Sequence, residues 1–286
     1  MSERSPVALT IAGSDSGAGA GVQADLRTFA ALGVYGTSAI AAVTAQNTLG
    51  VSAVHYVPAQ SVAAQIDAIF DDFNVAAIKI GMLGAAPIVA AVAARLGRLP
   101  SPERSSAGGD KGAKPLTRAF VVFDPVTTAS SGDALSREGF LDAVKAKLLA
   151  FVDCLTPNLA EAAALLGETE ARDEAAMTAQ GRALLALGPR AVLMKGGHLP
   201  SPEAIDLLVT GEGVRRYAGP RIASANMHGA GCTLSAAIAA HIALGAALED
   251  AVAQAKAFVA KAIEAGRDVK LGAGRGPLMQ TPLGKS

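Results

Sequence analysis

The chain has 286 residues, and its 25 Lys and Arg residues balance its 25 Asp and Glu residues. A neutral chain with no tryptophan and only 4% aromatic residues lacks the basic footprint of nucleic-acid binders, so we expect no nucleic-acid partner. Its two cysteines exclude a disulfide scaffold. Because neither a signal peptide nor a membrane-spanning run is recognised, we expect a cytoplasmic protein without membrane association.

Strand-like and helix-like runs alternate along the chain. Short apolar runs typical of strands occupy residues 7–11, 36–44, 51–57, 76–80, 119–123, 152–156 and 191–194, and runs at helical spacing follow most of them. Two further strand-like runs, 204–209 and 214–218, pair naturally around Gly211 and Gly213. This alternation predicts an α/β protein with helices on both faces of a mostly parallel sheet. We expect one domain over residues 1–286, with a flexible surface loop at about 100–117.

A glycine-rich segment at residues 13–21 follows the first strand and opens the first helix. It has neither the Gly-Lys-Ser/Thr ending of a P-loop nor a persuasive dinucleotide-binding acid, so we interpret it as a loop that lets a ligand approach the backbone. A tight turn is the alternative. Gln46 and Asn47 end the next strand, where an amide can recognise the edge of a heterocycle, although turn chemistry also explains Asn47.

Other polar residues also follow predicted strands. Asp124 follows the strand at residues 119–123, and Lys195 follows the strand at 191–194. A buried ammonium is costly unless it faces an anion, so Lys195 favours a phosphate partner. Asn158 and Glu161 open a helix and can share one face of its first turn. A capping box and a metal role both explain this pair, and both interpretations stay open here.

A second glycine-rich segment, residues 226–235, leads into an apolar helical run that ends near Gly245. The N–H groups and the dipole of its first turn would attract a phosphate or a developing oxyanion. Cys232 lies in this turn, where its pKa is expected to fall below the usual value of about 8.5, giving a thiolate near neutral pH. A small cysteine that fills a core gap is the alternative.

Both glycine-rich segments and the polar residues above lie at the carboxyl ends of predicted strands. Ligands bind beyond those ends in open α/β sheets. The convergence therefore favours one ligand site over a separate structural explanation for each motif.

Short segments at residues 9–15, 21–26, 45–48, 79–83, 156–162, 194–198 and 228–235 together resemble the ribokinase-like superfamily. More closely, they resemble the bacterial hydroxymethylpyrimidine/phosphomethylpyrimidine kinases of thiamin biosynthesis, over nearly the whole chain. The resemblance implies a three-layer α/β/α fold with a small edge or lid element. It also implies ATP and Mg²⁺ as cofactors, a homodimer, and two successive phosphorylations of 4-amino-5-hydroxymethyl-2-methylpyrimidine, first to the monophosphate and then to the diphosphate.

The family's pattern also assigns a substrate pocket. The resemblance implies that Gln46 holds the edge of the pyrimidine ring. Gly13, Asp25 and Met82 would complete the pocket around the ring.

The transfer centre is assigned to the second glycine-rich segment. The resemblance implies that Cys232 takes the proton of the substrate hydroxyl. The backbone N–H groups of Gly229, Ala230, Gly231 and Cys232 would face the γ-phosphoryl oxygens as an anion hole, and Lys195 would neutralise charge on the nucleotide phosphates.

The cofactors are assigned to two neighbouring segments. Asn158 and Glu161 match an Asn-x-x-Glu element that positions magnesium and phosphate. Asp124 would assist at the metal, beside Glu161, and Lys195 would contact the nucleotide.

The chain departs from the family's pattern in several places. Met227 and Ala230 replace two threonines whose hydroxyls could contact phosphate. Thr127 stands where methionine is common, and Ser130 replaces a usual lysine. We expect the two missing hydroxyls to affect the efficiency of one phosphorylation step, and Ser130 to weaken lid contacts with a phosphorylated substrate.

Two other functions fit parts of the sequence. A pyridoxine/pyridoxal kinase shares the superfamily and phosphorylates a similar flat ring, although Cys232 and Gln46 favour the pyrimidine. A pyrimidine-binding sensor without catalysis would explain the departures, but it would not need Cys232 and Lys195.

Overall fold

The computed structural model describes residues 5–100, 118–129, 131–197 and 199–281. These residues form a nine-stranded sheet in the order β3-β2-β1-β4-β5-β6-β7-β8-β9. Six neighbouring strands are parallel: β1 (Val7–Asp15), β2 (Tyr35–Gln46), β4 (Val75–Ile80), β5 (Phe120–Phe123), β6 (Cys154–Leu155) and β7 (Ala191–Lys195). At the edges, β3 (Val51–Tyr56), β8 (Glu203–Thr210) and β9 (Val214–Pro220) are antiparallel to their neighbours.

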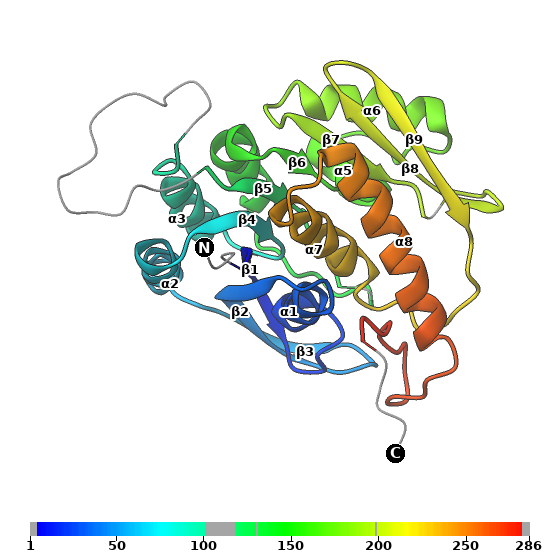
Figure 1. The fold of residues 1–286 in the computed structure, drawn as a ribbon, viewed down its shortest axis with the longest axis horizontal. Helices are drawn as coiled ribbons and strands as arrows, with labels where there is room; N and C mark the ends of the chain where they lie inside the picture. Colours follow the sequence, from blue (N-terminus) through cyan, green and yellow to red (C-terminus); the bar gives the residue numbers. More distant parts are fainter. Residues whose placement is uncertain (1–4, 101–117, 130, 198, 282–286) are drawn as a thin grey trace.

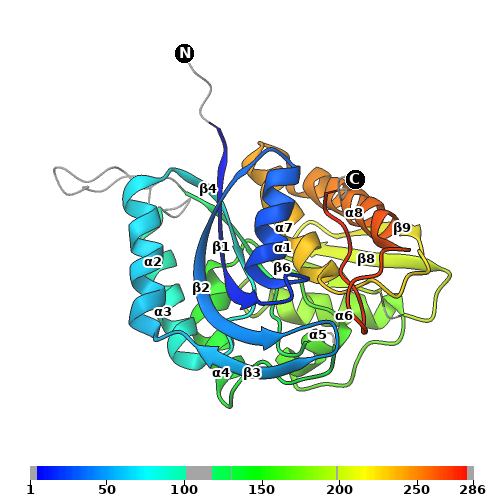
Figure 2. The ribbon, with the colours of Figure 1, turned by 90° about the horizontal axis from the view of Figure 1, so that it is seen from below.

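Helices cover both faces of the sheet, which confirms the predicted three-layer α/β/α fold (Figures 1 and 2). One face packs against α2 (Ala59–Asp72), α3 (Ala86–Leu96), α4 (Phe140–Ala143), α5 (Leu159–Leu166) and α6 (Glu174–Leu185). The other face packs against α1 (Gly21–Ala31), α7 (Ala230–Ala243) and α8 (Leu248–Gly266). Within the described residues, no helix combines the length and apolarity needed to cross a bilayer.

The period of two along β1 and β4 separates large from small core residues. Leu9 and Ile78 belong to the core on the α2 and α3 side, whereas Ala8 and Ala77 belong to the core on the α7 side. Because α7 is itself rich in buried alanine, its backbone packs close to the sheet. This close packing positions the start of α7 at the carboxyl ends of the strands.

Several predicted boundaries shift in the structure. The first strand was expected to end at residue 11, but β1 continues to Asp15 because a bulge between Ala12 and Gly13 keeps it paired with β2. The helix expected at 139–149 is α-helical only over Phe140–Ala143 and continues as a π-helical and then a 3₁₀ turn. The surface loop expected at about 100–117 lies outside the described residues, except for Pro100.

The segment after α8 turns back along α8 to the second glycine-rich segment. Asn226 holds it in place, because its amide nitrogen donates to the carbonyl oxygens of Gly266 and Val269, each at 2.7 Å. The N–H of His228 donates to the Gly276 carbonyl oxygen at 3.2 Å. The sequence predicted only a loop here, whereas these contacts buttress the start of α7.

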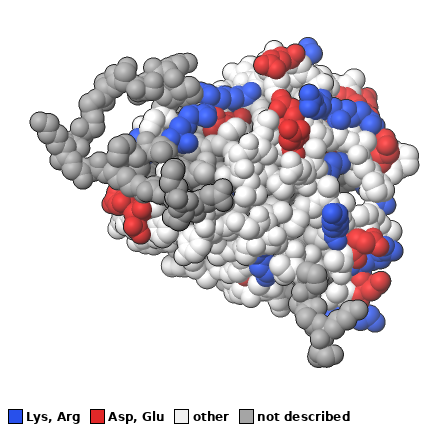
Figure 3. Space-filling model, in the orientation of Figure 1, with Lys and Arg blue, Asp and Glu red and all other residues white. Residues whose placement is uncertain are grey.

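Charged side chains of both signs are interspersed over the face shown in Figure 3, mainly around its periphery. The centre of this face is largely uncharged. The pattern agrees with the balanced composition of the chain.

Candidate active site

The predicted site residues gather at the carboxyl ends of the parallel strands. They line a cavity of about 960 Å³ that is bounded by the ends of these strands and the start of α7. Its lining includes Gly13, Gln46, Met82, Asp124, Asn158, Glu161, Lys195, Gly229, Ala230, Gly231 and Cys232. Of the predicted site residues, Asp25 does not line the cavity.

One end of the cavity is an apolar slot. Met82 packs there with Ala42, Ala129 and Leu135. Gly13 leaves room for Met82, because a Cβ atom at Gly13 would lie 3.0 Å from the methionine sulfur. The Gln46 side chain also lines the cavity, so the site combines an apolar slot with an amide, as binding of a flat heterocycle requires.

Asp25 was expected to contact the substrate, but it lies buried in α1 beneath the cavity. Its Oδ2 accepts hydrogen bonds from Lys79 Nζ at 2.8 Å and from Thr10 Oγ1 at 2.6 Å. Burial raises the pKa of Asp25 above its usual value. For Lys79, burial alone would lower the pKa, but the nearby carboxylate of Asp25 raises the pKa of this lysine above its usual value. Lys79 itself lines the cavity, so Asp25 acts on the site through this lysine.

Cys232 lies in the first turn of α7, which begins after Gly229 in a left-handed conformation with φ of 85°. A Cβ atom at Gly229 would lie 2.0 Å from the Gly19 carbonyl oxygen, so glycine is required for this close approach. The expected lowering of the thiol pKa is wrong. Burial raises the pKa of Cys232 to about 11, although Lys79 and the N–H of Gly21 act in the opposite direction. The thiol is therefore protonated at neutral pH.

The first turn of α7 offers backbone donors to the cavity. The N–H groups of Gly231 and Cys232 meet no acceptor in the described part of the chain, whereas the N–H of Ala230 donates to the Met227 carbonyl oxygen at 3.2 Å. Gly231 also allows the turn to approach the charged centre, since a Cβ atom there would lie 3.3 Å from Lys195 Nζ. Among the N–H groups that the prediction assigns to an anion hole, that of Ala230 therefore already has a backbone acceptor, whereas those of Gly231 and Cys232 have none in the described residues.

Lys195, at the end of β7, is shared by two carboxyl groups. Its Nζ lies 2.6 Å from Asp124 Oδ1 and 3.7 Å from Glu161 Oε2. Burial alone would lower the pKa of Lys195, but Asp124 and Glu161 raise it above its usual value. Burial also raises the pKa of Glu161 to about 7, even though Lys195 lowers it. The centre therefore contains a permanent cation and a carboxyl group that ionises near neutral pH.

Asn158 and Glu161 form a capping box at the start of α5. The N–H of Glu161 donates to Asn158 Oδ1 at 2.8 Å, and the N–H of Asn158 donates to Glu161 Oε2 at 2.7 Å. The capping interpretation is thus observed, and it fixes the carboxyl group of Glu161 beside Lys195.

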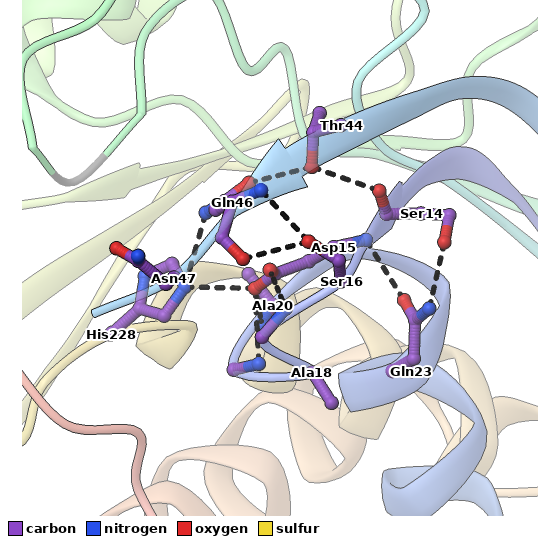
Figure 4. A network of polar contacts seen from close by, with 12 residues as sticks. Ser14, Asp15, Ser16, Ala18, Ala20, Gln23, Thr44, Gln46, Asn47 and His228 are labelled. Carbon is purple, nitrogen blue, oxygen red and sulfur yellow. Dashed lines mark hydrogen bonds and ion pairs between the residues drawn. The ribbon is translucent and has the colours of Figure 1, made fainter. Parts of the chain in front are cut away.

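Asp15 and His228, one from each glycine-rich segment, also line the cavity, although neither was assigned a role of its own from the sequence. His228 Nε2 lies 3.0 Å from Asp15 Oδ2, and the two side chains join the two glycine-rich segments (Figure 4). An aspartate followed by Gly17 and Gly19 is a usable signal, because such a carboxylate often accepts hydrogen bonds from the next N–H groups.

The other end of the cavity runs beside α8 and the β8–β9 hairpin. Ile222, Val259 and Ile263 give it apolar walls. Lys256 Nζ lies 2.5 Å from Asp206 Oδ2 and adds a charged pair to the same wall. With a volume of about 960 Å³, the cavity therefore has apolar and charged walls for a second ligand beside the slot.

The departures from the family's pattern have different structural consequences. Ala230 packs against the apolar cluster of Ala262, Ile263 and Leu278, and Met227 is 42% exposed. The Thr127 carbonyl oxygen accepts a hydrogen bond from the N–H of Leu135 at 2.8 Å. Ser130 lies outside the described residues.

The fold and the site together define a small-molecule kinase of the ribokinase-like class. The sequence pattern of the phosphomethylpyrimidine kinase family matches residues 15–105 and 110–279. The chain belongs to this family.

Relatives and solved structures agree with this assignment. A hydroxymethylpyrimidine/phosphomethylpyrimidine kinase of Rhizobium meliloti is 49% identical over 272 residues, which is 95% of this chain and 96% of the relative. A crystal structure of phosphomethylpyrimidine kinase from Clostridium difficile is 37% identical, with a TM-score of 0.74 over 90% of this chain and 99% of that one. The pyridoxal kinase of Staphylococcus aureus in complex with AMP-PCP and pyridoxal is 30% identical, with a TM-score of 0.82 over 97% of this chain and 94% of that one.

We predict that Lys79→Met destabilises the protein by about 3 to 5 kcal/mol, because it leaves the Asp25 carboxyl group buried without its cation. Adding Asp25→Asn should recover much of this loss, since Asn still accepts from Thr10 and no buried charge remains. Urea unfolding monitored by circular dichroism measures both variants. A loss below about 1 kcal/mol in the single variant would contradict the importance of the pair.

The Glu161 carboxyl group should make stability depend on pH. Its pKa rises from 4.5 to about 7 on folding, so the folded state binds the proton more tightly. The free energy of unfolding should therefore fall as pH rises from about 4.5 to about 7, by up to about 3 kcal/mol from this group. Glu161→Gln keeps a capping-box acceptor but has no such titration. Urea unfolding from pH 5 to 8 should show a shallower decline in this variant, and parallel curves would exclude the effect.

Proposed function

We propose that this chain transfers the γ-phosphoryl group of ATP to 4-amino-5-hydroxymethyl-2-methylpyrimidine and then phosphorylates the resulting monophosphate to the diphosphate. One observation carries the proposal: a slot lined by Met82 and Gln46 shares a cavity with Cys232 and Lys195. The family to which the chain belongs supports the same substrate. The apolar slot would hold the ring while its hydroxymethyl group faces the start of α7.

The nucleotide would lie along the α8 end of the cavity. The apolar walls beside Val259 and Ile263 suit an adenine ring, and Lys195, which lines the same cavity, would contact the triphosphate. Complexes of the Staphylococcus aureus pyridoxal kinase with ADP and with AMP-PCP support the use of ATP by this fold. The chain's own lysine then balances the phosphate charge, which phosphoryl transfer requires.

Magnesium fits the donors that this centre offers. Asp124 and Glu161 provide hard oxygen ligands beside the same ammonium group. No group of three or more His, Cys, Asp or Glu residues that could hold a metal occurs among the described residues. Two carboxyl groups suit Mg²⁺, which takes its remaining ligands from phosphates and water and neutralises their charge when bound.

The start of α7 would stabilise the transferred group. The N–H groups of Gly231 and Cys232 would donate to the phosphoryl oxygens, where the helix dipole adds positive potential. Cys232 would accept the proton of the substrate hydroxyl in its thiolate form, which Lys79 and the N–H of Gly21 favour. Because the transition state of phosphoryl transfer is loose, the base needs to take the hydroxyl proton only when the transfer is well advanced.

We also propose that the protein is a cytoplasmic homodimer. The exposed edge strand β3 lies near two exposed apolar side chains, Leu49 (68% exposed) and Val43 (47% exposed). A second copy that covered this edge would bury both side chains and would provide hydrogen-bond partners for the backbone groups along the outer edge of β3.

Phosphorus NMR tests the proposed function directly. The purified protein is incubated with Mg-ATP and, separately, with the hydroxymethylpyrimidine, its monophosphate and pyridoxine. Signals of both the pyrimidine monophosphate and the diphosphate are expected. Transfer to pyridoxine alone would instead indicate a vitamin B6 kinase, and transfer to none of the three would contradict kinase activity.

We predict that Cys232→Ala lowers turnover by about 10²- to 10⁴-fold, the usual contribution of a positioned base, while substrate binding persists. Because the thiol pKa is about 11, the wild-type rate should rise with pH above neutrality, and this rise should be lost in the variant. Steady-state kinetics from pH 6.5 to 9.5 measure both effects. Wild-type-like turnover in a folded Cys232→Ala protein would eliminate the proposed base.

A further inference from the structure

A single carboxylate, that of Asp15, ties the end of β1 to the first glycine-rich segment. Its Oδ1 accepts from the N–H of Gly17 at 2.8 Å, and its Oδ2 accepts from the N–H groups of Gly19 and Ala20 at 3.0 and 2.9 Å. Burial alone would raise the pKa of Asp15, but these hydrogen bonds and His228 lower it below its usual value. The group is therefore an ionised acceptor at neutral pH.

The imidazole of His228 completes this set of donors. Its Nε2 lies 3.0 Å from Asp15 Oδ2, and its side chain is 10% exposed. Because an ionised carboxylate only accepts, Nε2 must carry a hydrogen. The ring is packed tightly, since a Cβ atom at Gly19 would lie 2.2 Å from His228 Cδ2. Its position is thus fixed by both charge and shape.

The side-chain amide of Gln46 lies between this imidazole and Thr44 (Figure 4). One end of the amide is 3.0 Å from Thr44 Oγ1, and the other is 3.4 Å from His228 Nε2. Thr44 has one hydroxyl hydrogen, and the Ser14 carbonyl oxygen, also at 3.0 Å, accepts it. The Thr44 oxygen is then free to accept from the amide.

These hydrogen bonds decide which way the amide faces. If Thr44 donated to the amide oxygen, the amide nitrogen would point at the N–H of His228, and two donors would oppose each other. With the amide turned over, Gln46 donates to Thr44, and its oxygen lies 3.4 Å from Nε2, where it shares the hydrogen that His228 donates to Asp15. The hydroxyl hydrogen of Thr44 and the Nε2 hydrogen of His228 then both have acceptors, and the second amide hydrogen of Gln46 remains for a ligand.

We propose that His228, oriented by Asp15, is a positioning residue that determines the hydrogen-bonding face of Gln46. In this arrangement Gln46 offers the slot an N–H donor, which recognises an acceptor such as a ring nitrogen of the substrate. The inference rests on the proposed function, because it concerns how the same cavity selects its heterocycle. It also connects ring recognition to the transfer centre, since His228 directly precedes Gly229.

Two variants of His228 test the proposal: the disruptive His228→Leu and the conservative His228→Gln. His228→Leu fills the space without a donor, whereas His228→Gln places an amide N–H close to the former Nε2. In His228→Leu, KM for the hydroxymethylpyrimidine should rise at least tenfold, with a smaller change in kcat. His228→Gln should restore most of the affinity. Equal KM values in wild type and His228→Leu, or no recovery in a folded His228→Gln protein, would overturn the proposal.

Asn47→Ser provides a matched control beside Gln46, because Asn47 does not line the cavity and serves the turn instead. The Asn47 side chain accepts from the N–H groups of Leu49 and Gly50, at 2.8 and 3.3 Å, and is exposed. Serine can accept in the same turn. This variant should keep the KM and kcat of the wild type, so an increase in KM equal to that of His228→Leu would overturn the specific role of His228.

Nitrogen NMR of the ligand-free protein tests the geometry without catalysis. The chain has four histidines, and His228→Gln assigns the signal of His228 in ¹⁵N-histidine-labelled protein. Nε2 should be protonated at pH 7.5. A deprotonated Nε2 would overturn the proposal even if the kinetics agreed. Conversely, a protonated Nε2 in a wild-type protein that phosphorylates no substrate would support this geometry while the proposed function failed.

Discussion

The cost of removing ammonium groups from water constrains this site more than any other term. A cavity that receives phosphates needs positive charge, yet Lys79 and Lys195 are both largely enclosed by protein. Each must therefore be paired, Lys79 with Asp25 and Lys195 with Asp124 and Glu161. The carboxyl groups that the sequence suggests as metal or substrate ligands are the partners that keep these lysines charged.

The same constraint explains why the centre is poised to respond to a nucleotide. Glu161 has a pKa of about 7 because burial opposes its charge while Lys195 supports it. A phosphate chain would compete for Lys195, whereas a cation would favour ionised Glu161. The capping box holds the carboxyl group in place in either case, so a change of charge need not move the backbone of α5.

How much of this could be read from the sequence depends on the kind of interaction. The strands and the cavity at their carboxyl ends were predictable, because apolar periodicity and glycine position are local signals. Asp25 was misplaced, since whether a residue in the first turns of α1 faces the cavity or the core depends on packing against Thr10 and Lys79. The pKa of Cys232 was misjudged for a related reason: the sequence shows the helix N-terminus but not the depth of burial that outweighs it.

The likeness to both pyrimidine and pyridoxal kinases locates substrate choice within the cavity. Both substrates are flat rings with a hydroxymethyl group, so the transfer centre around Lys195 and Cys232 cannot distinguish them by chemistry. Discrimination must arise where the ring edge meets fixed donors and acceptors, because a misplaced donor costs far more than a small change in apolar fit. In this chain that place is the amide of Gln46, whose orientation is held by groups from three separate segments. A change of specificity could therefore come from residues that never touch the substrate, provided that they reorient this amide.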